Sequence, residues 1–417
     1  MTTTALALPA SAEAHDEAPV AGERAPLLAR LRAGPWVRGI AWDTVWMLSA
    51  VWLAPLVLIL ATIGDDPRTG WLDAVYCWLT ALLWLGHRIG STWLAYATTA
   101  YRPLLRAEPF RFLAMPALIA VCCFGLLLPD ESGMVGWSRA QRVMVLAILD
   151  YVLVTHHFAS QHFGALSLYR ARAGRTATAA LRRLDRWYAL VVGGALVVVA
   201  EIVAGTICYV DVWIDPWLDP DRIAAAATTI AEIATIVVGA STLGMLLLEA
   251  RSPRPSLPRA LYLVGLAAMV VTALYVRTPF VFVVLWTTQH WLVATGLTTL
   301  VAEGEPTPAR GWRSALHAVN RRPWALLLVL LALSLLLLPI MEVEAVDGDG
   351  PFYAERIFGA LADALRTSTW APALVALGFT TGFQHYWLDR AVYRFSDPRV
   401  RDAARSVIAQ SPATDDR

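Results

Sequence analysis

Hydrophobic side chains gather in long runs along most of this chain, and short polar connections separate the runs. Windows of about twenty apolar residues, the length that a helix needs to cross a bilayer, recur throughout. The pattern therefore predicts an all-α fold, a polytopic integral membrane helical bundle. We expect ten transmembrane helices, over residues 41–63, 71–98, 110–128, 140–169, 187–208, 223–248, 258–275, 280–301, 324–341 and 370–393.

The remaining segments divide the chain into a membrane domain and two tails. We expect a disordered cytoplasmic tail over 1–38, a transmembrane domain over 39–395 and a cytoplasmic tail over 396–417. Within the domain, 308–322 is typical of an interfacial helix because its apolar and Arg side chains lie mostly on different sides. Charged residues interrupt 342–369, which predicts an outer loop with a surface helix.

Arginine side chains fall in alternate connections, which fixes an expected orientation. They follow every second predicted span, as at Arg102 and Arg106, Arg170, Arg172 and Arg175, Arg251 and Arg254, Arg310 and Arg313, and Arg390 and Arg394. The intervening connections are acidic, as in 211–221 and 342–349. Basic connections stay on the cytoplasmic side of a membrane. We therefore expect both termini in the cytoplasm and the chain in the inner (plasma) membrane.

Composition supports this class and excludes others. The 417 residues are 57% hydrophobic and 16% charged, more apolar than a water-soluble fold can bury. The lipid bilayer is thus the expected partner, and a net charge of +1 argues against nucleic acid. All 34 basic residues are Arg, so the chain has neither a P-loop lysine nor a Schiff-base lysine.

Three of the five glutamines precede a histidine and an aromatic residue inside apolar runs. These triplets are Gln161-His162-Phe163, Gln289-His290-Trp291 and Gln384-His385-Tyr386. Because a polar ring inside a bilayer is costly unless it is paired or bound to a metal, the repeat predicts a shared site. All histidines within the predicted spans lie on helices that run in one direction, most of them at similar depth. The candidate metal ligands are His87, His156, His157, His162, His290 and His385.

Polar residues at helical spacing accompany these histidines. Asp150 and Gln161 fall on the helix face of His157, and Asp389 follows His385 by one turn. A carboxylate beside a ligating imidazole commonly orients the ring. We therefore expect Asp150, Gln161 and Asp389 to take part in catalysis. His156 and His157 face different directions on a helix, so His157 is the stronger candidate ligand.

The ligand types favour iron, copper or zinc, because magnesium and calcium prefer oxygen. The chain lacks the HExxH pattern of zinc hydrolases, which leaves oxidation chemistry. The run His-His-x4-His at 156–162 resembles the histidine boxes of the integral-membrane desaturase and hydroxylase class. That resemblance implies two irons that oxidise lipid chains with oxygen. It covers seven residues, and the His-x-x-His-His form of that class is absent from the sequence, so the resemblance is one of chemistry.

We therefore expect a histidine-ligated membrane metalloenzyme, a non-haem iron oxidoreductase or oxygenase of hydroxylase or desaturase type with two iron ions. Its substrate would be a hydrophobic or lipid-like molecule, and an electron donor would supply the enzyme with electrons. One alternative is a haem-b electron-transfer protein with paired histidines as axial ligands. Another is a proton-coupled transporter that uses Asp150, Glu232 and the histidines as a relay.

The Arg distribution makes the orientation testable with single cysteines placed in a background without the four native ones. In intact cells, an impermeant thiol reagent should modify Asp215→Cys and should reach Arg175→Cys only after lysis. The reverse pattern of modification would overturn the orientation.

Overall fold

The computed structural model describes residues 34–63, 75, 77–129, 136–175, 178–204, 220–277, 281, 283–305, 311, 313–341 and 357–404. Over these residues the fold is all-helical, with no strand, as the hydrophobic pattern predicts. Several helices contain a π-helical turn, labelled η. In chain order the elements are α2 (Ile40–Val45), α3 (Ser49–Ile63), η1 (Thr80–Trp84), α5 (Leu85–Ala97), α6 (Arg102–Ala107), η2 (Phe110–Ala114), α7 (Met115–Leu127), α8 (Arg139–Arg172), α9 (Ala179–Leu190), η3 (Val191–Ala195), α10 (Leu196–Ala204), α12 (Pro220–Ala250), α13 (Leu257–Val276), η4 (Val283–Thr287), α15 (Thr288–Glu303), α16 (Arg313–Asn320), α17 (Pro323–Met341), α19 (Ala360–Arg366), α20 (Ala371–Val392) and α21 (Pro398–Ala403).

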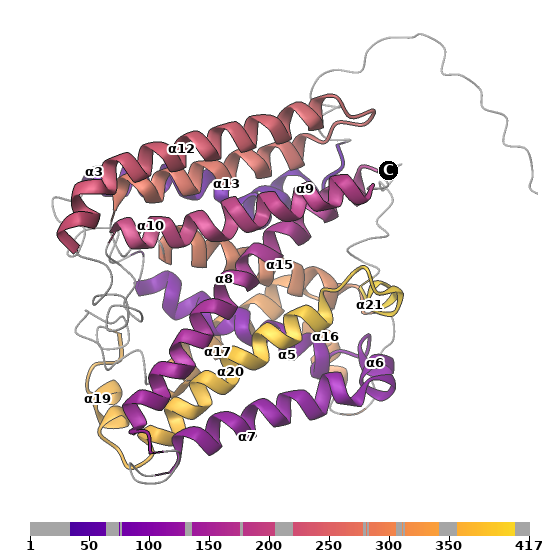
Figure 1. Ribbon diagram of the computed structural model, residues 1–417. Coiled ribbons are helices and arrows are strands. Elements are labelled where there is room, and N and C mark those ends of the chain that lie inside the picture. Colours follow the sequence, from indigo (N-terminus) through magenta and orange to yellow (C-terminus); the bar gives the residue numbers. More distant parts are fainter. Residues whose placement is uncertain are drawn as a thin grey trace, which may run out of the picture.

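The long helices form two packed groups with two helices between them (Figure 1). In the upper group, α13 packs against α3, α12 and α10. In the lower group, α20 packs against α7, α5 and α17. Helix α8 contacts α9, α13 and α20, and helix α15 contacts α3, α5 and α17. These two helices therefore join the groups through the middle of the bundle.

The two joining helices differ in how the sequence forms them. The side chain of Ser138 caps α8 by accepting from the backbone of Gln141, whose own side chain accepts in return from Ser138. With 34 residues, α8 is about 51 Å long, well above the ~30 Å of a bilayer interior, and it runs diagonally across the bundle (Figure 1). In α15, every residue from Thr288 to Ala302 is buried, so this helix presents no face to the surroundings.

Six of the described helices are long and apolar enough to span a membrane, which makes the chain a membrane protein. They are Phe110–Leu127, Arg139–Arg172, Ala179–Val203, Ala225–Ala250, Leu257–Val276 and Pro323–Met341. Helices also lie in the other four predicted ranges, as α3, α5, α15 and α20. Three of these four carry histidine, which lowers their hydropathy. The count of ten spans and the orientation of the termini stay predictions.

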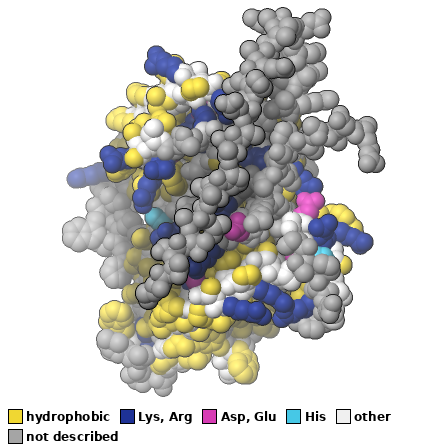
Figure 2. All heavy atoms as spheres, turned by 90° about the vertical axis from the view of Figure 1, so that its right-hand side faces the viewer, with side chains coloured by type: hydrophobic (Ala, Val, Ile, Leu, Met, Phe, Trp, Pro, Cys, Tyr) yellow, Lys and Arg dark blue, Asp and Glu magenta, His cyan; other side chains and the backbone are white. Residues whose placement is uncertain are grey.

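Exposed Arg side chains collect at the end of the bundle that carries α6, α16 and α21. Figure 2 views this end and shows them spread across it among apolar side chains. The exposed Arg residues at the ends of the helices and in the connections on this side include Arg106, Arg182, Arg183, Arg251, Arg254, Arg321, Arg322 and Arg394. This sidedness agrees with the expected topology, in which this end faces the cytoplasm.

The segments beyond the membrane domain are described in part. Residues 1–33 and 405–417 of the predicted tails lie outside the described residues. Residues 34–38 pack on the bundle, where Trp36 and Val37 are buried and the backbone of Val37 donates to Asp43. In the second tail, α21 buries Val400. Helices α16 and α19 lie in the predicted interfacial and outer segments, respectively.

Glu305, which follows α15, connects the ends of α15, α5 and α16 through hydrogen bonds. It accepts hydrogen bonds from the backbone and hydroxyl of Thr99, after α5, and from the amide of Asn320 on α16. Burial alone would raise the pKa of Glu305, but these hydrogen bonds outweigh it and hold the pKa below its usual value. His317 lies 3.1 Å from the same carboxylate. His317 is thus a partly exposed residue on α16, in neither group of histidines that could hold a metal.

A buried ion network joins four helices at the same end. Asp185 on α9 lies 2.8 Å from Arg170 on α8 and 2.6 Å from Arg259 on α13. Arg259 also contacts Glu249 on α12, which Arg175 binds in turn at 2.7 Å. Both carboxylates are almost fully buried, so each guanidinium depends on them for charge compensation.

Removal of one carboxylate should therefore destabilise the bundle. We expect Asp185→Asn to lower the free energy of unfolding by about 3–5 kcal/mol, because Arg170 and Arg259 lose their shared counter-charge while still buried. The matched control is Asp363→Asn, whose 62%-exposed side chain pairs with Arg366 and should cost about 0–1 kcal/mol. Thermal unfolding in detergent measures both, and equal losses would contradict the proposed role of the network.

Candidate metal centre

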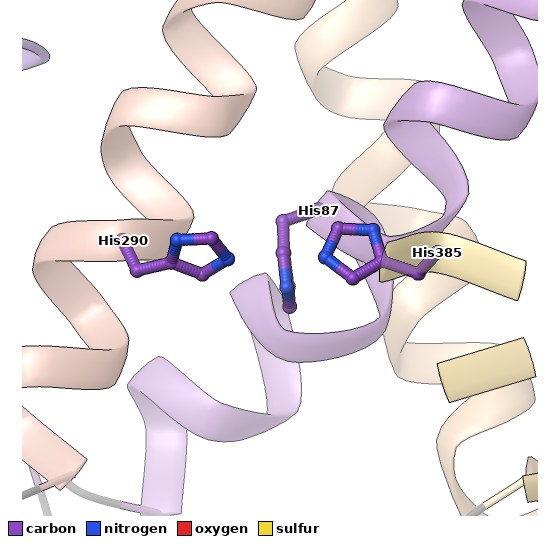
Figure 3. A group of neighbouring side chains, drawn as sticks. All are labelled: His87, His290 and His385. Carbon is purple, nitrogen blue, oxygen red and sulfur yellow. The ribbon is translucent and has the colours of Figure 1, made fainter. Parts of the chain in front are cut away.

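Four imidazole rings from four helices meet inside the bundle. They belong to His87 on α5, His157 on α8, His290 on α15 and His385 on α20. The ring centroid of His87 lies 5.0 Å from that of His290 and 4.7 Å from that of His385. The centroid of His157 lies 4.7 Å and 4.9 Å from the same two rings. Figure 3 shows the rings of His290 and His385 pointing toward His87 from opposite sides.

The potential ligand atoms form two overlapping groups. The first group is His87, His290 and His385, and the second is His157, His385 and Asp389. Within each group the donor atoms lie within 4.8 Å of one another, close enough for a single ion. His385 belongs to both groups. The arrangement can therefore hold one ion, or two ions that share or divide the ligands around His385.

Gln161 orients the ring of His290 through two hydrogen bonds. Its amide oxygen lies 2.6 Å from Nδ1 of His290, and its amide nitrogen donates to the carbonyl oxygen of the same residue at 3.0 Å. An amide oxygen only accepts hydrogen bonds, so Nδ1 must carry the hydrogen of the neutral ring. Nε2 is then left with its lone pair facing the cluster, 3.2 Å from Nε2 of His157. This is the outer support that a metal-ligating histidine usually has.

Asp389 stands between two of the rings. One carboxylate oxygen lies 3.4 Å from Nδ1 of His385, and the other lies 3.5 Å from Nε2 of His157. The hydroxyl of Ser91 is also 3.5 Å from Nδ1 of His385. These separations exceed those of good hydrogen bonds. The carboxylate is therefore close enough to join the ligands but is not held tightly by either ring.

Two buried ring nitrogens in the cluster lack hydrogen bonds. Among the described residues, no partner is found for Nδ1 of His87 or for Nε2 of His385. A buried polar atom without a partner is costly and needs an explanation. A metal ion among the rings would satisfy such atoms. The residues present thus fit a metal ion in two respects: their side chains are suitable ligands, and two of the buried ring nitrogens have no hydrogen bond.

Two of the four histidines follow a π-helical turn directly. His87 is the third residue after η1, and His290 is the third residue after η4. A π turn inserts extra backbone into a helix and rotates the residues that come after it, and such turns occur frequently at functional sites. Helices α5 and α15 therefore present these rings at angles that a regular helix through the preceding spans would not give.

Two predicted ligands stay outside both groups. His156 is exposed on the outer face of α8, because one residue along a helix rotates a side chain by about 100° away from His157. His162 is buried, but its Nδ1 lies 2.8 Å from the hydroxyl of Tyr262. The structure therefore assembles four of the six predicted histidines and separates His156 and His162 from them.

The predicted acidic residues have different positions. Asp389 lies among the potential ligands, whereas Asp150 accepts a hydrogen bond from Tyr386 at 3.1 Å and belongs to neither group. The ring of Tyr386 in turn lies 5.1 Å from that of His157. Glu232, which the transporter alternative requires, is exposed on α12. Asp150 is thus linked to the cluster through Tyr386.

Two residues near the cluster were not among the predicted site residues. Ser91 follows His87 by four residues, and Tyr386 directly follows His385. The spacing of Ser91 was a usable signal, since residues four apart share a helix face. Tyr386 is the aromatic residue of the third Gln-His-aromatic triplet, but its contact with Asp150 depends on the packing of α20 with α8, which the triplet does not specify.

Comparisons with protein-family models, with curated proteins and with solved structures give no match to this chain. The functional argument therefore depends on the residues and geometry of this chain.

The support of His290 by Gln161 is testable through metal affinity. We expect Gln161→Leu to weaken the binding of Zn²⁺, used as a redox-silent probe, by about 10–100-fold, the usual effect of losing such an outer partner. The matched control is Gln384→Leu, since the Gln384 amide donates to the carbonyl oxygen of Pro116, on α7. Competition with a chelator measures both affinities. Wild-type affinity in Gln161→Leu would show that the amide does not orient a ligand.

Proposed function

We propose that this chain is an integral membrane metalloenzyme that binds non-haem iron and oxidises a hydrophobic or lipid-like molecule. The convergence of His87, His157, His290 and His385 around two unsatisfied ring nitrogens carries this proposal. Isolated histidines that serve helix packing would each have a partner in a different interface. In this chain the four imidazole rings instead lie next to one another in a single cluster.

The ligand set favours iron over most other metals. Four imidazoles and one carboxylate suit iron, copper or zinc and are poor in the oxygen ligands that magnesium and calcium need. A mixture of histidine with a carboxylate is typical of non-haem iron sites that use oxygen. Two ions are favoured because the two groups of ligands overlap only at His385. An iron pair would supply the electron transfer and oxygen chemistry that the side chains themselves lack.

The surroundings of the site favour an apolar substrate. Tyr386 contacts His157 and also packs with an apolar cluster that includes Phe379 and Phe383 on α20 and Leu146 on α8. On another side, the ring of Trp291 lies 5.7 Å from that of His87. A molecule from the bilayer could approach such walls without carrying water. Within this proposal, Asp150 positions Tyr386 at the substrate side of His157.

The two alternatives receive less support from the geometry. A haem between two axial histidines needs a flat slot, whereas each of these four rings lies within 5.0 Å of another histidine ring. A proton relay through Asp150 and Glu232 would need Glu232 near the histidines, and Glu232 is exposed on α12. The identity of the electron donor is outside the proposal.

The proposal predicts which histidines control iron binding. Purified wild-type protein should contain iron, and His157→Ala and His385→Ala should lose it while the protein still inserts into the membrane. His156→Ala is a matched control, because it removes the neighbouring imidazole from the exposed face and should keep the iron. Asp389→Asn should act more mildly, with affinity lowered by about 10–100-fold. Elemental mass spectrometry of the purified variants measures each iron content.

Absorption spectra of the same samples separate the alternatives. Wild-type protein should lack a Soret band, since the iron is not in haem. A Soret band that disappears in His385→Ala would establish the haem alternative. Wild-type protein without any transition metal, or His157→Ala with full iron content, would contradict the proposal.

A further inference from the structure

His162 and Tyr262 form a buried pair beside the metal centre. Nδ1 of His162, on α8, lies 2.8 Å from the phenolic oxygen of Tyr262, on α13, and both residues are only 1% exposed. The ring of His162 packs directly on Gly193 of η3, where a Cβ atom would lie 2.5 Å from the ring carbon Cδ2. The backbone around the pair is thus shaped to admit this imidazole.

The Gln-His repeats connect this pair to the cluster from two sides. Gln161 binds the ring of His290 and is followed in the chain by His162. Gln289 lies beside the phenol of Tyr262 and is followed in the chain by His290. Gln161 therefore contacts the histidine that follows Gln289, and Gln289 lies beside the tyrosine that pairs with the histidine following Gln161. The phenol of Tyr262 is thus close to Gln289, the residue that precedes the candidate ligand His290 in the chain.

A phenol hydrogen-bonded to an imidazole can give up an electron and a proton together. Removal of an electron from a phenol makes its hydroxyl a very strong acid, so the oxidation is favourable only where a base can take the proton. A heavy-atom separation of 2.6–3.2 Å permits that transfer, and 2.8 Å lies inside this range. Neutral imidazole is a suitable base, because imidazolium is a far weaker acid than the hydroxyl of an oxidised phenol.

We propose that Tyr262 is a redox-active tyrosine of this protein, with His162 as its proton acceptor. This inference rests on the proposed function, because an oxidised iron ion of the cluster is the oxidant. One electron passes from Tyr262 to that ion, which is reduced by one unit of charge. The phenolic O–H bond breaks, and an N–H bond forms at Nδ1 of His162. The products are a neutral tyrosyl radical and an imidazolium ion.

Other buried tyrosines of the described residues hydrogen-bond different groups, as Tyr169 does in donating to the carboxylate of Asp43 at 3.0 Å. Tyr188, on α9, bonds the hydroxyl of Thr242 and a backbone carbonyl, neither of which is a base. Tyr386 bonds Asp150, but Arg88 lies near the same carboxylate, since a Cβ atom at Gly382 would lie 3.6 Å from an oxygen of Asp150 and 3.7 Å from the guanidinium carbon of Arg88. Asp150 thus already has a cationic neighbour. Tyr262 is paired with an imidazole instead, and Tyr169 and Tyr386, which both donate to a carboxylate, are competing sites that the experiment must exclude.

Electron paramagnetic resonance on the full-length, iron-loaded protein tests this inference. The protein is loaded with Fe²⁺ in detergent, exposed to oxygen and frozen within the first turnover. We expect a radical signal that narrows when the protein contains ring-deuterated tyrosine. Tyr262→Phe should lose the signal with its iron content unchanged. Tyr188→Phe should keep it, as a buried tyrosine without a basic partner.

The role of His162 has its own variant. His162→Gln keeps a polar side chain at this position but removes the base, so iron content should stay at the wild-type level while the radical is lost. A tyrosine signal that persists in Tyr262→Phe and disappears in Tyr169→Phe or in Tyr386→Phe would overturn the assignment. Iron-loaded wild type without any tyrosine radical would also overturn it. Wild type that binds no iron would instead contradict the proposed function, so the two failures are distinguishable.

Discussion

An imidazole inside a membrane must find a partner for each ring nitrogen, and the centre of this bundle is organised around that requirement. Water is not available to satisfy the rings, so helices far apart in the chain have to supply donors and acceptors. Gln161 does this for His290, and Tyr262 does it for His162. At Nδ1 of His87 and Nε2 of His385, the described residues supply no hydrogen-bond partner, and these two atoms are where an ion would bind under the proposed function.

Much of this arrangement could be predicted from hydropathy and helix geometry. The ten apolar ranges all contain helices, because the backbone of a bilayer-spanning segment must satisfy itself. The convergence of His87, His157, His290 and His385 followed from their common depth and common helix direction. The proximity of Asp389 to His385 followed from the spacing of one helical turn.

The divergence of His156 from His157 followed from regular helix geometry, but the π turns and the partner of His162 could not be predicted in the same way. A face is assigned by assuming a regular 3.6-residue period, and η1, η3 and η4 each break that period next to a histidine or its packing partner. The partner of His162 is Tyr262, a hundred residues away, and nothing local in the sequence specifies it. Long-range pairing of this kind is decided by how α8 and α13 pack.

The complete burial of α15 has a consequence for how the protein is made. This helix is enclosed by α3 and α5, which precede it in the chain, and by α17, which follows it. His385, which both ligand groups share, lies later still, on α20. A nascent chain that has inserted α15 therefore has its polar residues in the bilayer before their final neighbours exist. The candidate metal centre can close only when nearly all of the helices have been synthesised, so we expect any metal to be loaded late in biogenesis.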